Sequence, residues 1–161
     1  MEHKTIKEGQ AAEPLACGCP GSHVHVITHP ETRREDIPFH AASELQQWPV
    51  QIKLVPIDAA FFDNAHLLIV ADCAAYACGD FHNRFMKNKI TIIGCPKLDD
   101  LDYSEKLSEI ISKNNIKSMT VVRMEVPCCG GMDQAAITAL KNSGKVMPWQ
   151  VVTLSTGGEV L

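Results

Sequence analysis

Residues 119–141 read MTVVRMEVPCCGGMDQAAITALK and contain the transition that decides the fold. The apolar run over 119–126 is typical of a buried strand, and a helical pattern follows over 132–141. Two adjacent cysteines, Cys128 and Cys129, therefore lie where a strand ends and a helix begins. The carboxyl end of a parallel strand is where open α/β sheets bind their ligands.

The same alternation of strand and helix runs outward from this stretch through the rest of the chain. Strands are predicted over 50–56, 67–71, 90–93, 119–126 and 149–154, and helices over 59–64, 73–87, 103–114 and 130–141. Asp72 is the candidate N-cap of the helix over 73–87, and Gly144 suits the end of the last helix. This order predicts one α/β domain with a mainly parallel sheet of about five strands and helices on both faces.

The first part of the chain has a different character. Residues 1–48 show no sustained hydrophobic period and are broken by prolines and glycines. We therefore predict an irregular N-terminal arm over 1–48, carrying Cys17 and Cys19, and the α/β cluster-binding domain over 49–161.

Composition and charge exclude several classes of function. The chain has 161 residues and a formal net charge of -4, with no basic stripe, so neither nucleic acid nor an anionic membrane surface is an expected partner. Its apolar runs are too short to span a bilayer. Residues 1–10 are polar, without the apolar core of a secretory signal. We expect a cytoplasmic protein.

The number of cysteines is the main indication of function. The seven are Cys17, Cys19, Cys73, Cys78, Cys95, Cys128 and Cys129. In a reducing compartment such a density of thiols indicates a metal, a cluster or redox chemistry more often than disulfides.

Cys73, Cys95 and the Cys128–Cys129 pair each follow one of the predicted strands. The carboxyl ends of parallel strands lie on one edge of a sheet, and neighbouring strands are about 4.8 Å apart. Thiols on these strand ends are therefore expected within roughly 5 to 10 Å of one another, the size of a small metal–sulfur cluster. Cys17 and Cys19 on the arm can fold over the same edge.

Local sequence favours iron over zinc at this edge. Structural zinc sites usually come as paired Cys-x2-Cys knuckles, and the sequence has none. Cys19-Pro20 and Cys95-Pro96 are similar to the Cys-Pro pairs beside iron–sulfur clusters. The two glycines after Cys129 can direct backbone N–H groups at cluster sulfides. The histidines His23, His25, His29 and His82 are weaker ligand candidates.

Several motifs together resemble a known family. They are Cys19-Pro20-Gly21-Ser22, Gln47-Trp48-Pro49, Ala71-Asp72-Cys73, Gly79-Asp80-Phe81-His82, Cys95-Pro96-Lys97-Leu98-Asp99-Asp100 and Glu125-Val126-Pro127-Cys128-Cys129-Gly130-Gly131. Over residues 17–161 the chain resembles the C-terminal domain of iron–sulfur-binding, dicluster ferredoxin-like proteins of anaerobic bacteria. In that family a ferredoxin module normally precedes this domain, and this chain does not carry one.

The resemblance implies a cluster and a redox context rather than a particular reaction. It ranks five cysteines as ligands above Cys17 and Cys78, because those two positions need not be cysteine in the family. The five are Cys19, Cys73, Cys95, Cys128 and Cys129. The implied cofactor is a 4Fe–4S cluster or a larger or unusual variant. The Cys-Cys-Gly triplet also resembles heterodisulfide reductases, which hold a non-cubane cluster, although their downstream Cys-x2-Cys is absent here.

Three functional hypotheses follow from the cysteines. The first is an iron–sulfur protein acting in electron transfer or small-molecule reduction, as an oxidoreductase served by a redox partner such as a ferredoxin. The second is a non-enzymatic, metal-stabilised subunit or sensor of a larger redox complex, for which a homo-oligomer is also compatible. The third is a redox protein that uses Cys128 and Cys129 as a vicinal dithiol. The alternative to all three is that the cysteines are simply buried core residues.

Overall fold

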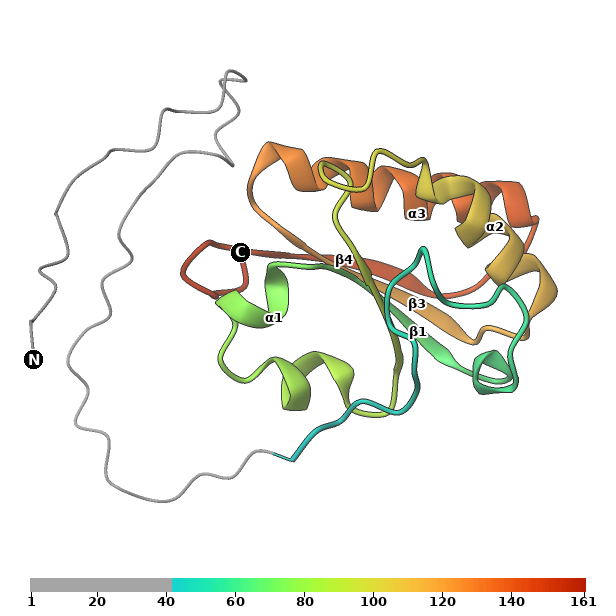
Figure 1. Cartoon of the computed structure of the whole chain (residues 1–161), viewed down its shortest axis with the longest axis horizontal. Coiled ribbons are helices and arrows are strands. Elements are labelled where there is room, and N and C mark those ends of the chain that lie inside the picture. Colours follow the sequence, from blue (N-terminus) through green and yellow to red (C-terminus); the bar gives the residue numbers. More distant parts are fainter. Residues whose placement is uncertain (1–41) are drawn as a thin grey trace, which may run out of the picture.

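Four parallel strands form a sheet at the centre of residues 42–161, the part of the chain that the structure, a computed structural model, describes. They are β1 (His66–Ala71), β2 (Ile90–Gly94), β3 (Ser118–Met124) and β4 (Trp149–Leu154). Their order in the sheet is β2-β1-β3-β4, and every neighbouring pair is parallel (Figure 1). The sequence prediction of an α/β domain with a parallel sheet is confirmed.

β1 lies inside the sheet, and its composition explains why. After His66 all of its residues are buried and apolar, as expected for a strand covered on both faces. Successive side chains alternate between the faces: Leu67 and Ile69 belong to one apolar core, whereas Leu68 and Val70 belong to another. The sheet therefore separates two hydrophobic layers.

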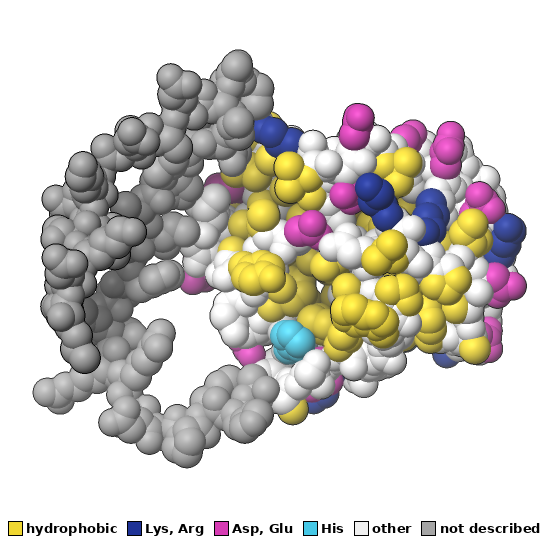
Figure 2. Space-filling model, viewed as in Figure 1, with side chains coloured by type: hydrophobic (Ala, Val, Ile, Leu, Met, Phe, Trp, Pro, Cys, Tyr) yellow, Lys and Arg dark blue, Asp and Glu magenta, His cyan; other side chains and the backbone are white. Residues whose placement is uncertain are grey.

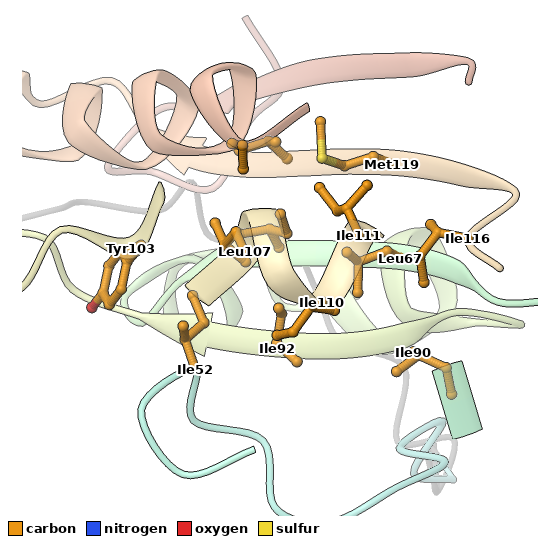
Figure 3. Packing of buried hydrophobic residues seen from close by; sticks show 14 of the residues in the cluster. Ile52, Leu67, Ile90, Ile92, Tyr103, Leu107, Ile110, Ile111, Ile116 and Met119 are labelled. Atoms are coloured by element: carbon orange, nitrogen blue, oxygen red, sulfur yellow. The ribbon is translucent and has the colours of Figure 1, made fainter. Parts of the chain in front are cut away.

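The larger layer lies under α2 (Tyr103–Lys113) and α3 (Gly130–Ser143), which pack side by side on the same face of the sheet (Figure 1). Leu107, Ile110 and Ile111 recur at the spacing of one helix face and are fully buried against the sheet (Figure 3). The Asp102 side chain caps α2 by accepting from the Ser104 N–H at 2.8 Å. α3 ends at Gly144, whose φ is +66°.

The opposite face is covered by shorter pieces. These are α1 (Ala74–Ala77) and a single π-helical segment, η3 (His82–Met86), with Phe81, Phe85 and Met86 packed against the sheet. Two short 3-10 turns complete the described elements, η2 (Ala60–Phe62) before β1 and η4 (Pro127–Cys129) between β3 and α3. Helices thus cover both faces, as predicted from the sequence.

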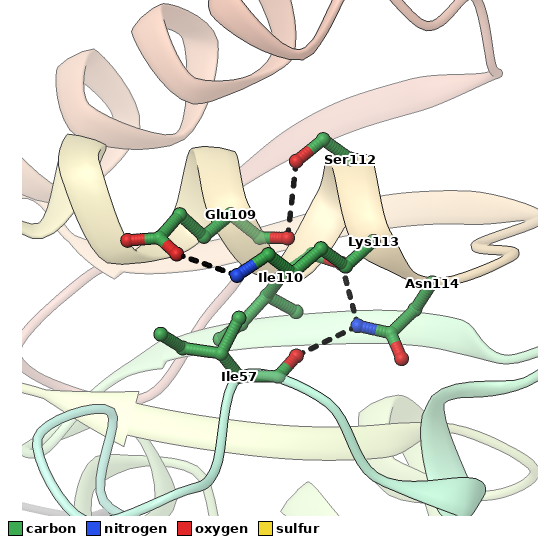
Figure 4. Close-up of polar contacts among 6 residues, drawn as sticks. All are labelled: Ile57, Glu109, Ile110, Ser112, Lys113 and Asn114. Carbon is green, nitrogen blue, oxygen red and sulfur yellow. Dashed lines mark hydrogen bonds and ion pairs between the residues drawn. The ribbon is translucent and has the colours of Figure 1, made fainter.

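The chain before β1 is tied to the end of α2. The Asn114 side-chain amide donates to the carbonyl oxygens of Ile57 and Ile110, each at 2.8 Å (Figure 4). The first bond reaches across the fold and the second closes the last turn of α2. The nearby Lys113–Glu109 ion pair, at 2.9 Å, is exposed and contributes little to stability.

Three local predictions were wrong. The strand expected over 50–56 is one parallel bridge, Gln51 to Ile93, so the sheet has four strands. The chain turns immediately, with the N–H groups of Leu54 and Val55 both donating to the Gln51 carbonyl at 2.9 Å. Pro56, which has no N–H to donate, lies where the strand would have continued.

The helix expected over 73–87 is broken. α1 ends at Cys78, whose backbone is extended, and the chain resumes at Phe81 as the π-helical segment. Gly79 and Asp80, both poor helix formers, occupy the break. Asp72 is not the N-cap of α1: Cys73 holds that position, without a side-chain cap bond.

Within residues 42–161, no helix combines the length and the apolar character needed to cross a bilayer.

Candidate functional site

The site lies where the order of the strands reverses. From β1 the chain moves to β2 on one side and then returns to β3 on the other side of β1. The carboxyl ends of β1 and β3 therefore border a topological switch point, where open α/β sheets bind ligands. Cys73 follows β1, and Cys128 and Cys129 follow β3. Cys95 follows β2 on the same edge, so three strands deliver four thiols to it.

The loops after β2 and β3 meet across the end of β1, although these two strands are not neighbours. A Cβ placed on Gly131 would lie 2.9 Å from the Cβ of Pro96, so only glycine allows the two loops this approach. The Asp72 N–H donates to the Gly94 carbonyl at 3.0 Å, which also joins the ends of β1 and β2. The segment that carries Cys73 is thus bonded through Asp72 to the end of β2, beside the contact between Pro96 and Gly131.

The four thiols differ in exposure and influence one another. Cys73 is exposed, Cys95 and Cys128 are half-buried, and Cys129 is buried. Burial raises the pKa of Cys73, and the charges of Cys95, Asp72 and Cys128 raise it further. None of the four forms a disulfide within residues 42–161.

Cys129 is the most strongly affected. Burial raises its pKa to about 11; a hydrogen bond from the Met124 backbone acts in the opposite direction, and the charges of Cys128, Cys73 and Cys95 add to the increase. Burial and the neighbouring charges thus favour the protonated forms of Cys73 and Cys129, whereas a metal ion binds the thiolate. Binding of a metal here would therefore release protons.

The arrangement is not a ready-made site for one ion. Among residues 42–161, no three His, Cys, Asp or Glu side chains are grouped closely enough to hold a single metal ion. A tetrahedral zinc ion with Zn–S bonds of 2.3 Å needs its sulfurs about 3.8 Å apart. Neighbouring strands lie about 4.8 Å apart, so sulfurs on different strand ends are expected at separations of roughly 5 to 10 Å.

A group of oxygen side chains lies beside the thiols. The Tyr103 hydroxyl donates to the Asp99 carboxylate. Burial and this hydrogen bond raise the pKa of Tyr103, while a hydrogen bond from the Cys95 backbone lowers it. The pKa of Asp72 is raised by burial and by the charge of Asp99, and lowered by a hydrogen bond from Gln51. Tyr103 therefore connects α2 directly to the loop that carries Cys95.

Sequence reasoning missed this group. Asp99 lies four residues before Tyr103, the first residue of α2, and this close spacing in the sequence is the signal that could have found the contact. Sequence reasoning also missed Arg123 on β3. The Arg123 Nε lies 3.7 Å from the Asp133 Oδ2 on α3, and a Cβ on Gly130 would lie 4.0 Å from an Arg123 terminal nitrogen. A guanidinium group is thus close to the first residue of α3, directly after Cys129.

The remaining candidate residues have other positions. Cys78 is buried among apolar residues at the end of α1, and its charge does not contribute to the pKa shift of Cys73 or Cys129. His82 lies on η3, where its Nδ1 accepts from the Glu44 N–H at 3.1 Å. The predictions for Cys17, Cys19, His23, His25 and His29 concern residues outside 42–161.

Comparison with known proteins agrees with this topology. A family described as "Rossmann-like domain" matches residues 59–161, a range that contains all five cysteines from Cys73 to Cys129. An uncharacterized protein of Archaeoglobus fulgidus is 37% identical over 103 residues, which cover 63% of this chain and 72% of that protein. No solved structure matches the chain. The chain belongs to the Rossmann-like domain family.

Proposed function

We propose that this protein binds an iron–sulfur cluster at the carboxyl edge of its sheet and acts in electron transfer or small-molecule reduction. The observation that carries the proposal is that three strand ends bring four thiols to one edge, where the charges of neighbouring thiols raise the pKa of Cys73 and of Cys129. The proposed ligands are Cys19, Cys73, Cys95, Cys128 and Cys129, and Cys17 ranks below them.

The chemistry of the donors supports iron and sulfide over a single hard or borderline ion. Thiolates are soft ligands that select zinc, copper(I) or iron–sulfur clusters. The spacing of the strand ends suits an object several ångströms wide, and no preformed group for one ion is found in residues 42–161. The sequence resemblance to the C-terminal domain of dicluster ferredoxin-like proteins supports the same cofactor.

The surroundings of Cys128 and Cys129 suit an anionic group. α3 has 14 residues and starts at Gly130, so the positive end of its dipole lies beside both thiols. The Gly130 N–H donates to the Pro127 carbonyl, and the backbone N–H groups that follow it in the first turn have no partner within the helix. The guanidinium of Arg123 adds positive charge close to Gly130.

The roles of the chain's residues follow from their positions. A bound cluster would supply one-electron transfer. Cys129 would hold it from the buried side, and Cys73 from the side exposed to solvent. Pro96 and Gly131, in contact, would keep the loops after β2 and β3 at a fixed separation. Electrons would reach the site through the exposed side, near Cys73.

A second candidate function is a non-enzymatic subunit of a redox complex. Large apolar side chains are exposed close to two of the thiols: Tyr76, three residues after Cys73, is 93% exposed, and Leu98, three residues after Cys95, is 80% exposed. Exposed apolar groups beside a site favour a protein partner docking there. In this case the isolated chain would hold the cluster but turn over no small molecule.

The proposal is tested on full-length protein purified without oxygen. Iron and acid-labile sulfide are measured in wild type, Cys95→Ser, Cys129→Ser and the matched control Cys78→Ala. Wild type and Cys78→Ala should contain both elements in similar amounts, and the two serine variants should lose most of them. Equal iron in all four proteins, or one zinc ion without sulfide, would rule the proposal out.

A further inference from the structure

A cavity on the α1 side of the sheet is separate from the proposed cluster site, because none of the described residues that line it is a cysteine. Its volume is about 390 Å³, within the range of small-molecule sites. Its walls come from the chain at 43–50, the ends of β1 and β2, α1 and η3. The same face has a hollow bordered by hydrophobic side chains, with a histidine at its rim (Figure 2).

Most of the lining is aliphatic, and two of the polar residues in it carry an oxygen without a partner. Thr91 is only 2% exposed, and its hydroxyl has no hydrogen-bond partner among residues 42–161. The Asp72 Oδ1 is buried and also has no partner in that part of the chain. Buried polar atoms are normally paired, so each requires a group that the described fold does not supply.

His82 adds a donor of defined position. Its Nδ1 accepts the Glu44 N–H, and Glu44 lies next to the cavity-lining residues Ser43 and Leu45. A neutral imidazole that accepts at Nδ1 carries its proton on Nε2. The cavity therefore combines an imidazole N–H donor, a hydroxyl group that can donate or accept, and a carboxylate acceptor.

We propose that this cavity binds a small uncharged molecule with an apolar body and an amide-like polar end, which pairs an N–H donor with a carbonyl acceptor. The aliphatic walls would hold the body, Asp72 and Thr91 would accept from the N–H, and His82 or Thr91 would donate to the carbonyl. Among the described residues the lining includes the acidic side chain of Asp72 and no Lys or Arg that would pair with an anion. This inference does not depend on a cluster.

The probe is benzamide, which has a flat apolar body and an amide end. Binding to full-length protein is measured by ligand-observed NMR and by isothermal titration, with sodium benzoate and benzylamine as comparison compounds. We expect saturable binding of benzamide, and binding at least tenfold weaker for benzoate and for benzylamine. Binding of either charged compound as tight as that of benzamide would overturn the proposed class of ligand.

Two variants locate the binding. Ala75 is exposed and lines the cavity, so Ala75→Trp should fill the opening without disturbing the core. Ala60→Trp adds the same side chain at an exposed position that does not line the cavity, and serves as the control. Benzamide binding should be lost in Ala75→Trp and retained in Ala60→Trp.

Thr91→Val tests the polar contact separately. Valine keeps the shape and removes the hydroxyl, so benzamide should bind at least fivefold more weakly while the fold is kept. Unchanged affinity in both Ala75→Trp and Thr91→Val would overturn the assignment to this cavity. Because the readout is binding of benzamide and not iron content, its failure is distinct from failure of the cluster proposal.

Discussion

Gly131, in the first turn of α3, lies directly against Pro96 in the loop after β2. A Cβ on Gly131 would stand 2.9 Å from the Cβ of Pro96, a separation that requires one of the two backbones to move. This contact joins the segments that carry Cys95 and Cys129 across the end of β1. The relative positions of the thiols therefore depend on a residue that is not itself a ligand.

Gly131→Ala should lower the free energy of unfolding by about 1–2 kcal/mol, because overpacking costs more than the helix gains from alanine. It should also reduce the iron content of protein purified without oxygen. Gly79→Ala is the matched control, since a Cβ there would have nothing within 4 Å. If the iron content and chemical denaturation curves of both variants match wild type, the contact does not position the site.

Arg123 should set the charge felt by a bound cluster. Replacing it with glutamine removes a cation near Gly130 and leaves Asp133 without its partner at 3.7 Å. The reduction potential should become more negative, because the reduced, more negative cluster loses stabilisation. Potentiometric EPR titration measures this, and Arg123→Lys should retain most of the wild-type value. A potential that is the same in the glutamine variant would show that the guanidinium does not act on the site.

Tyr103→Phe tests the connection between α2 and the Cys95 loop. The variant removes the hydroxyl that donates to Asp99 and leaves the buried ring in place. The free energy of unfolding should fall by about 1–2 kcal/mol, measured by urea denaturation. Leu107→Ala, which removes buried carbon from the same helix, should cost more, about 2–5 kcal/mol. A phenylalanine variant as stable as wild type would show that the hydrogen bond contributes no net stability.

The iron-free chain should lose stability in alkali. The Cys129 thiol has a pKa of about 11 in the folded chain, above its ordinary value of 9.0. Folding therefore favours the protonated thiol, and this contribution is complete below pH 9 and lost as the pH rises through 11. Denaturation curves from pH 8 to pH 11 should show a smaller decrease for Cys129→Ala than for wild type. Parallel pH profiles would contradict the assigned shift.

The parallel sheet and the position of the cysteines could be predicted because both depend on local pattern. In a chain that alternates strands with helices, apolar runs such as 67–71 and 119–126 indicate buried parallel strands. The cysteines at their ends then share an edge whatever the order of the strands. Placing the cysteines on one edge therefore required no knowledge of which strands are neighbours.

The details that shape the site could not be predicted, because they depend on the order of the strands. The contact between Gly131 and Pro96 spans the end of β1, which lies between β2 and β3. The cavity beside Thr91 is lined from both sides of the break at Gly79 in the helix predicted over 73–87, and a count of apolar residues does not reveal that break. Arg123 looks like an ordinary polar residue within a strand until α3 is placed beside it.

The most direct test of the central claim is the composition of full-length protein purified without oxygen. The account predicts brown protein with broad absorption near roughly 400 nm, about four or more iron atoms and matching acid-labile sulfide per chain, and an EPR signal that changes on reduction. A colourless chain that contains no iron and no sulfide, but retains the fold and has Cys73, Cys95, Cys128 and Cys129 in the reduced form, would contradict it.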